Sequence, residues 1–122
     1  MRMETVATAA VVLVALLHLC FLVLEMFLWT GPVGRRVFGL TEEFARESAA
    51  LAANQGLYNG FLAAGLVWGL TLGAGGRGVV TFFLLCVLVA GVFGAATVSR
   101  KILFVQAVPA AVALALWTIS QR

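Results

Sequence analysis

Four long apolar stretches dominate the sequence, and they constrain the fold more than any other feature. A helix that crosses the hydrocarbon core of a bilayer needs about 20 mostly apolar residues. The stretches lie at about 6–29, 51–72, 79–98 and 102–119, and together they take up most of the 122 residues. Hydrophobic residues make up 63% of the chain, whereas a soluble domain is about half apolar. The sequence therefore predicts an all-α fold, a transmembrane four-helix bundle that forms a single integral membrane domain over residues 1–122.

The connections between the predicted spans differ in length and character. Gly31 and Pro32 are expected to stop the first helix, and a polar stretch follows them. Thr41 has the side chain of a helix N-cap, so we expect an amphipathic segment over about 41–50 that continues into the second span. The other two connections are short: a glycine-rich turn at 73–78 and a three-residue link at 99–101.

Basic residues at the span ends predict the orientation. Four spans place both ends of the chain on one side of the membrane. Of the 8 basic residues, those near the first and third connections outnumber those on the other side; they are Arg35, Arg36, Arg46, Arg100 and Lys101 against Arg2, Arg77 and Arg122. The positive-inside rule then places these two connections in the cytoplasm. The lipid bilayer is the expected partner, and a net charge of only +3, spread along the chain, gives no support for nucleic acid.

Polar side chains inside the apolar stretches are the candidate functional residues. Ionisable groups are costly in a span, so they usually face the interior of a bundle or water. Glu25 is the one acidic residue within a predicted span, and His18 is the only histidine of the chain. They are seven residues apart, which is about two helical turns, so they point the same way. Glu25 lies about 10 Å nearer the first connection, given a rise of ~1.5 Å per residue.

The second span carries its polar residues in its first half, at about the depth of Glu25. These are Asn54, Gln55, Tyr58 and Asn59, and at ~100° per residue they cover an arc of about 140°. Small residues fall on the other side of the helix, where they allow a second backbone to come close; they are Gly56, Gly60, Ala63 and Ala64. The second span is therefore expected to have a polar face and a packing face.

The last two spans bring polar groups to the same half of the membrane. Gln106 is followed by Pro109, whose missing N–H frees a backbone carbonyl near Val105. Lys101 lies in the connection just before them. We therefore expect a candidate ligand-binding cluster made of Glu25, His18, Asn54, Gln55, Tyr58, Asn59, Gln106 and Lys101.

Each of these residues also has a plain structural interpretation. Glu25 is either an ion-pair partner of Arg100 or Lys101, a carboxylate that binds a proton or orients a ligand, or an acid that reaches the interface. His18 is either a packing residue or a proton relay to Glu25, and the amide and tyrosine side chains either join helices or line a pocket. One histidine and one glutamate do not complete a coordination sphere, so we expect no metal and no cofactor.

Three classes of function remain open at this point. The first is a binding or transport-type membrane protein with a small polar or lipid-soluble ligand, and because four spans are few for a transporter, a homo-oligomer is expected. The second is a membrane enzyme that acts on a lipophilic substrate, although no nucleophile–base pair, P-loop or dinucleotide fingerprint favours an enzyme. The third is a structural or accessory subunit whose polar groups lock the bundle. The ligand is unknown.

Four blocks of the sequence carry a family resemblance: LHLCFLVLEMFLW, RRVFGL, AANQGLYNGFLAAG and GAATVSRKILFVQAVPA. In this order they resemble the bacterial family called domain of unknown function 1304, over about residues 15–112. The resemblance implies a small four-span protein of the bacterial inner membrane, without an established activity. It draws attention to His18, Glu25, Asn54, Gln55, Gly56, Tyr58, Asn59, Gly60, Thr97, Lys101, Gln106 and Pro109.

Overall fold

The computed structural model describes residues 2–121, and every regular element in that range is helical. The elements are α1 (Met3–Met26), α2 (Pro32–Phe38), α3 (Glu42–Thr71), the 3₁₀ turn η1 (Gly73–Gly76), α4 (Arg77–Thr97), the π-helical turn η2 (Leu103–Ala107) and α5 (Val108–Ser120). The predicted all-α class is confirmed for these residues. Arg122, which was counted in the predicted orientation, lies outside the described residues.

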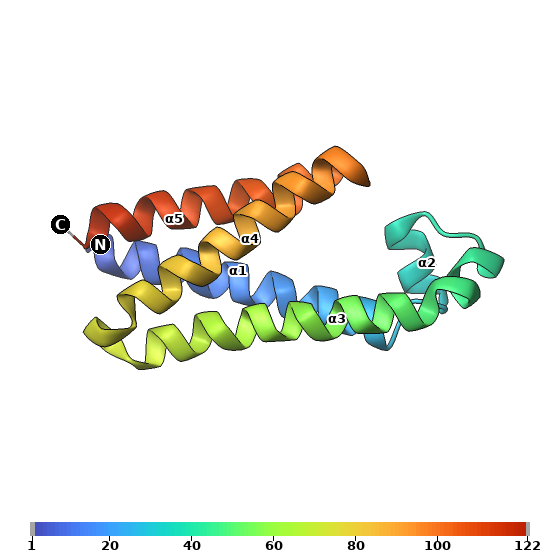
Figure 1. Ribbon diagram of the computed structural model, residues 1–122, viewed down its shortest axis with the longest axis horizontal. Helices are drawn as coiled ribbons and strands as arrows, with labels where there is room; N and C mark the ends of the chain where they lie inside the picture. The colour runs from blue at the N-terminus through green and yellow to red at the C-terminus, as the bar shows by residue number, and fades with distance from the viewer. Residues whose placement is uncertain (1, 122) are drawn as a thin grey trace.

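The helices α1, α3, α4 and α5 run back and forth beside one another (Figure 1). α1 packs against α3 and α5, and α4 packs against the same two helices. Their shared core is made of small and branched apolar side chains such as Val11, Leu66 and Leu84, which are fully buried. The two ends of the chain lie at the same end of the molecule. At the other end, α4 and α5 diverge from α3 (Figure 1).

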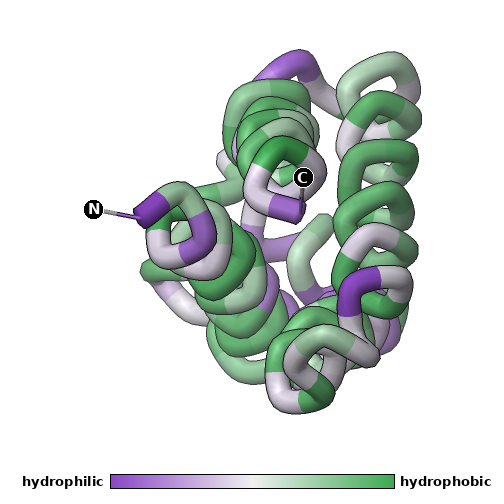
Figure 2. The backbone as a smooth tube through the Cα atoms, turned by 90° about the vertical axis from the view of Figure 1, so that its left-hand side faces the viewer, coloured by the Kyte–Doolittle hydropathy of each residue, from purple (hydrophilic) through white to green (hydrophobic). Residues whose placement is uncertain are grey.

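Within residues 2–121, three helical stretches are long and apolar enough to cross a membrane: Met3–Met26, Gly73–Thr97 and Leu103–Ser120. α3 is 30 residues long but does not meet this criterion, because its first half is polar. Figure 2, seen from the end where both chain termini lie, shows that hydrophobic positions cover most of the long helices. Large apolar side chains such as Leu13, Phe82 and Val112 are exposed. Such exposure is unusual for a soluble protein and is expected on a surface that faces lipid.

The first connection contains a helix that the sequence pattern did not predict. α1 ends at Met26, three residues before the predicted end of the first span. Pro32 was expected to stop a helix; instead it begins α2, because its missing N–H needs no partner in a first turn. Gly39, with φ of 65°, ends α2 in the left-handed conformation that glycine adopts easily. Seven residues are too few to show a helical period, so the pattern gave no signal.

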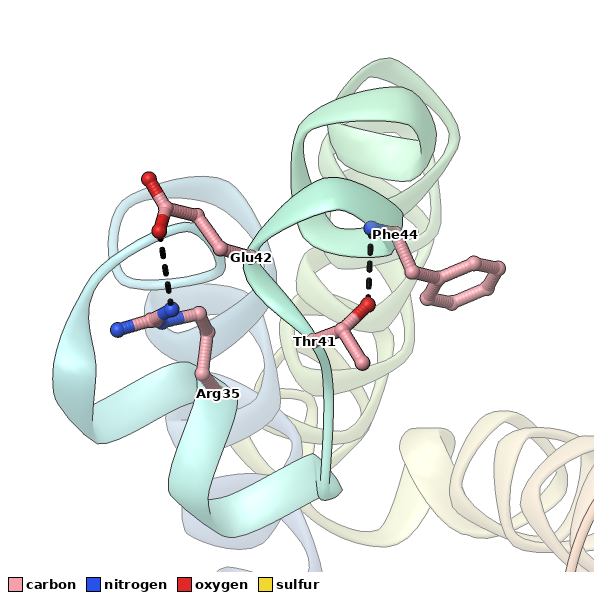
Figure 3. Close-up of polar contacts among 4 residues, drawn as sticks. All are labelled: Arg35, Thr41, Glu42 and Phe44. Carbon is pink, nitrogen blue, oxygen red and sulfur yellow. Dashed lines mark hydrogen bonds and ion pairs between the residues drawn. The ribbon is translucent and has the colours of Figure 1, made fainter.

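Thr41 starts α3 as predicted (Figure 3). The backbone N–H of Phe44 donates to Oγ1 of Thr41 over 3.1 Å, so the N-cap is confirmed. Arg35 of α2 forms an ion pair with Glu42, with 3.8 Å between Nη1 and Oε2, which ties α2 to the first turn of α3. α3 then continues to Thr71 as one helix, as expected for an amphipathic segment that continues into an apolar one.

Glycines set how closely the helices approach. A Cβ on Gly56 would lie 2.7 Å from Cγ of Met26 and 3.1 Å from Cβ of Glu25, so α1 sits directly on this side of α3. A Cβ on Gly60 would lie 2.7 Å from a methyl carbon of Leu22. Gly56 and Gly60 are therefore used for packing of α3 against α1 within the chain.

The chain bends into a π-helical turn before Pro109. Proline has no N–H to donate, and the five residues of η2 precede α5. The N–H of Val108 bonds to the carbonyl of Leu103, five residues back, as in a π-helix. The distortion expected near Val105 therefore lies within η2, and η2 also carries Gln106.

Candidate functional site

Glu25 and Asn59 form a buried polar pair between α1 and α3. Nδ2 of Asn59 donates a hydrogen bond of 2.7 Å to Oε1 of Glu25. The exposed fractions of the two residues are 9% and 5%. Gly56, one turn before Asn59, removes the side chain that would hold the two backbones apart. The pair thus depends on the close approach of α1 and α3.

His18 lies two turns before Glu25 on α1 and faces a different neighbour. It is fully buried. Its Nδ1 lies 2.8 Å from the carbonyl oxygen of Val14, which can only accept a hydrogen bond, so Nδ1 is the donor. Nε2 is then the acceptor for Nε2 of Gln106, at 3.4 Å. The histidine therefore links α1 to η2.

The carboxylate of Glu25 keeps one oxygen without a protein partner. Among residues 2–121, no hydrogen bond reaches Oε2 and no basic side chain lies within ion-pair distance of Glu25. Arg100 and Lys101 are exposed, so the structural ion pair that we considered for Glu25 is not formed here. Oε2 is also not among the fully buried polar atoms that lack a partner. It can therefore still accept a hydrogen bond from a molecule that reaches it.

The other predicted cluster residues lie on the outside of the protein. Asn54, Gln55 and Tyr58 are exposed, as is Lys101. In the described part of the chain, the side chains of these four residues form no hydrogen bond, and the backbone N–H of Lys101 donates to Oγ of Ser99. The expected cluster of eight residues is thus divided. The reason is that α3 meets α1 through its small residues, which turns most of the polar arc away and leaves only Asn59, at its edge, inside.

Gln55 and Tyr58 lie on the side of α3 that faces α4 further along the helix. Residues 55, 58, 62, 65 and 69 recur at spacings of three and four, so they share one side of the helix. In this set Gly65 lies against Phe83 and Gly69 against Val80, both on α4. Gln55 and Tyr58 continue the same side toward the end where α4 diverges from α3 (Figure 1). They are exposed because α4 no longer covers them.

Two open hollows lie away from the Glu25–Asn59 pair. One, of about 380 Å³, is an apolar groove between α4 and α5 lined by residues such as Leu88 and Leu114. The other, of about 300 Å³, lies at the end where both chain termini lie, and we call it the terminal hollow. Its lining residues include Glu4, Thr8, Gly73, Arg77, Trp117 and Gln121. The sequence pattern did not single it out, because its residues come from both ends and the middle of the chain.

A metal site would need several coordinating side chains close together. In the range 2–121, no group of three or more His, Cys, Asp or Glu side chains comes together. The buried polar residues themselves offer hydrogen-bonding and ionisable groups. Glu25 offers a carboxylate oxygen. His18 lies seven residues earlier on α1, about 10 Å away at ~1.5 Å per residue, and offers an imidazole. Gln106 of η2 lies beside His18 and offers an amide.

Comparison with known proteins identifies relatives but no activity. The family described as "Protein of unknown function (DUF1304)" matches residues 12–118. The uncharacterized protein YpaA of Lactococcus lactis subsp. lactis (strain IL1403) is 31% identical over 96 residues, which cover 77% of this chain and 81% of the relative. No solved structure matches the chain.

Proposed function

This chain belongs to the DUF1304 family of proteins of unknown function, and we propose that it is a multi-pass membrane protein of transport type. Its ligand is a small cationic or hydrogen-bond-donating molecule that binds at Glu25. Asn59 holds the carboxylate in place, and Gln55 and Tyr58 lie along the approach from the side where α4 has diverged. His18 and Gln106 form a second polar position deeper along α1.

This proposal rests on one observation: the buried Glu25 carboxylate has a single hydrogen-bond donor and no basic partner among the described residues. A buried charge without a partner is strongly unfavourable, so buried acids are normally paired or fully hydrogen-bonded. Glu25 is nine-tenths buried, yet it has one amide donor and no basic partner among the described residues. A cation or a hydrogen-bond donor at Oε2 would supply the missing partner. Because Oε2 is not fully buried, a bound molecule can reach it and supply that partner.

The arrangement of the helices supports four membrane crossings. α1 and α4 both begin at the end where the chain termini lie (Figure 1), and both are apolar and long enough to cross. The chain between them must return through the membrane, and α3 is the helix that runs back. We place the protein in a bacterial inner membrane. The connections that carry Arg35, Arg36, Arg100 and Lys101 then lie on the cytoplasmic side, because the excess of basic residues is there.

Replacing Glu25 with Gln should remove ligand binding. The probe is ethidium, a lipophilic cation with two amino groups, titrated into the detergent-purified protein and followed by fluorescence anisotropy. We expect saturable binding by the unchanged protein and binding at least about tenfold weaker in Glu25→Gln, which is a loss of about 1.4 kcal/mol. Glu43→Gln is the matched control, since Glu43 is an exposed acid in the first turn of α3.

The outcome of this titration separates two functions. Equal binding by the unchanged protein and Glu25→Gln, or no saturable binding by either, would contradict a ligand site at Glu25. If Glu25→Gln also lowered the stability of the protein while no binding was seen, the pair would be a structural lock between α1 and α3. The protein would then be an accessory subunit.

The outer side of α3 supports the expected homo-oligomer. A line of exposed residues recurs at alternating spacings of three and four, as in a coiled-coil seam; it consists of Glu47, Ala50, Asn54, Leu57, Phe61, Ala64, Trp68 and Thr71. Two copies inserted with the same orientation and related by a two-fold axis place identical residues opposite each other. An asparagine amide both donates and accepts, so Asn54 can bond to its own copy.

Asn54→Leu should therefore weaken association between copies. One interhelical hydrogen bond in a membrane contributes about 1 kcal/mol, so we expect the dimer to dissociate at about fivefold higher protein concentration. Energy transfer between two labelled pools of the protein in detergent measures this. Gln55→Leu is the control, because residue 55 is exposed on another side of α3. If both substitutions left energy transfer unchanged, Asn54 would not lie in an interface between copies.

A further inference from the structure

The terminal hollow lies where a membrane-spanning bundle would meet the headgroups of the lipids. The beginnings of α1 and α4 and the ends of α3 and α5 surround it, together with η1. Trp117 lines it and donates from its indole Nε1 to the carbonyl of Arg77 over 3.4 Å. Tryptophan is enriched at membrane–water interfaces. With a volume of about 300 Å³, the hollow has the space of about ten waters.

The hollow carries a positive charge on one helix and a negative charge on another. Arg77 is the first residue of α4, whose first turn has no acidic residue and no side-chain cap. The arginine and the positive end of the helix dipole therefore act together on an anion. Glu4 lies in the first turn of α1. The two residues form no ion pair with each other; the ion pair found in residues 2–121 joins Arg35 and Glu42.

A buried acceptor at the hollow also lacks a donor. Oε1 of Gln121 is buried and has no hydrogen-bond partner within residues 2–121. The amide nitrogen of the same side chain donates to Oγ of Ser120 over 3.0 Å. A buried acceptor without a donor costs about 1–3 kcal/mol. Because Oε1 has almost no accessible surface, an occupant of the hollow that supplies an N–H group removes this cost only when the side chain of Gln121 turns toward it.

From these features we infer that the terminal hollow binds a phosphoethanolamine group, the headgroup of a membrane phospholipid. The phosphate lies beside Arg77 and the N-terminus of α4, and the ammonium faces Glu4 and Gln121. The acyl chains leave the hollow into the bilayer beside Leu70, which also lines it. This site is independent of the one proposed at Glu25, since it lies at the opposite end of α1.

The lining predicts a preference among headgroups. A phosphocholine group has the same charges but no N–H, so it cannot donate a hydrogen bond to the carboxylate of Glu4. A phosphoglycerol group has the phosphate but no cation for Glu4. Only a primary ammonium combines the positive charge with hydrogen-bond donors. Phosphatidylethanolamine should therefore be retained in preference to the other two lipids.

Native mass spectrometry of the detergent-purified protein tests this preference. The protein is mixed with equal amounts of dioleoyl phosphatidylethanolamine, phosphatidylcholine and phosphatidylglycerol. We expect the first to be bound at least fivefold more than either of the others. Glu4→Gln and Arg77→Gln should each abolish the preference, and Arg36→Gln, an exposed arginine at the opposite end, should keep it. Circular dichroism checks that each variant folds. If Arg77→Gln does not fold, Glu4→Gln alone is used to test the preference.

A soluble competitor identifies the source of the headgroup. If glycerophosphoethanolamine fails to displace the bound phosphatidylethanolamine, the occupant is a membrane lipid, as we propose. If it displaces the lipid at equal concentration, the phosphoethanolamine site stands but its natural occupant is the soluble form. Equal retention of the three lipids by the unchanged protein, or a preference that survives Glu4→Gln, would overturn the site.

Discussion

Valine at position 91 should push η2 away from α4 and lower the free energy of unfolding by about 3 kcal/mol. A Cβ on Gly91 would lie 2.7 Å from the backbone nitrogen of Ala107 and 2.9 Å from its Cα. Backbone atoms cannot rotate away as the end of a flexible side chain can. The two extra methyl groups of valine then have no space, since Gly91 and Ala107 are both buried.

The effect should be compared with that of a substitution at a glycine where an added Cβ meets no other atom. Gly78 lies on the same helix, and no atom lies within 4 Å of a Cβ placed there. Gly78→Ala should leave stability unchanged or raise it by up to about 1 kcal/mol, because alanine favours the helix. Loss of helical circular dichroism during titration with sodium dodecyl sulfate in mixed micelles compares the variants. Stability of Gly91→Val within about 1 kcal/mol of the unchanged protein would contradict the close contact.

The sequence was most informative where a helix follows from a local run of apolar residues. A run of apolar residues about 20 long predicts a helix from local sequence alone. This is why α1, α4 and the stretch from η2 to the end of α5 lie close to the predicted ranges. Thr41 was identifiable as a cap because capping involves only residues that are close in sequence. α2 was missed because its seven residues, which Pro32 begins and Gly39 ends, are too few to show a helical period.

The burial of Glu25 and His18 could be anticipated from the sequence, but which asparagine of α3 is buried could not. Glu25 and His18 stand out because each is ionisable and lies in an apolar run, and both are buried. Asn54 and Asn59 look alike in sequence, at the two edges of one wide polar arc. Which edge is buried depends on the angle at which α1 meets Gly56 and Gly60. That angle is set by packing between distant segments.

The residues that line the terminal hollow were even harder to predict from the sequence. Glu4, Arg77 and Gln121 lie at the start, middle and end of the chain. Each is an ordinary polar residue beside an apolar helix, and only the return of the helices to one end brings them around a common space. No local pattern could have indicated them.

Removing the amide of Asn59 should destabilise the protein because it leaves Glu25 buried without a donor. In Asn59→Ala the 2.7 Å hydrogen bond to Oε1 is lost, while α1 and α3 still enclose the carboxylate. Removing one partner of a buried polar pair that involves a charge costs about 3 kcal/mol. Gln55→Ala is the matched control, because Gln55 is an exposed amide one turn earlier on α3, and its loss should change stability by less than about 0.5 kcal/mol.

A second substitution shows whether the carboxylate is the cause. Met resembles glutamate in length but needs no hydrogen bond, so Glu25→Met combined with Asn59→Ala removes both partners. Replacing both members of a buried polar pair by apolar groups can be nearly neutral, and we expect the double variant to recover at least about half of the stability that Asn59→Ala loses. The same titration in mixed micelles compares the variants. If the double variant were as unstable as Asn59→Ala, the loss would come from the cavity left by the amide, and the Glu25 carboxylate would not be a buried group that depends on its donor.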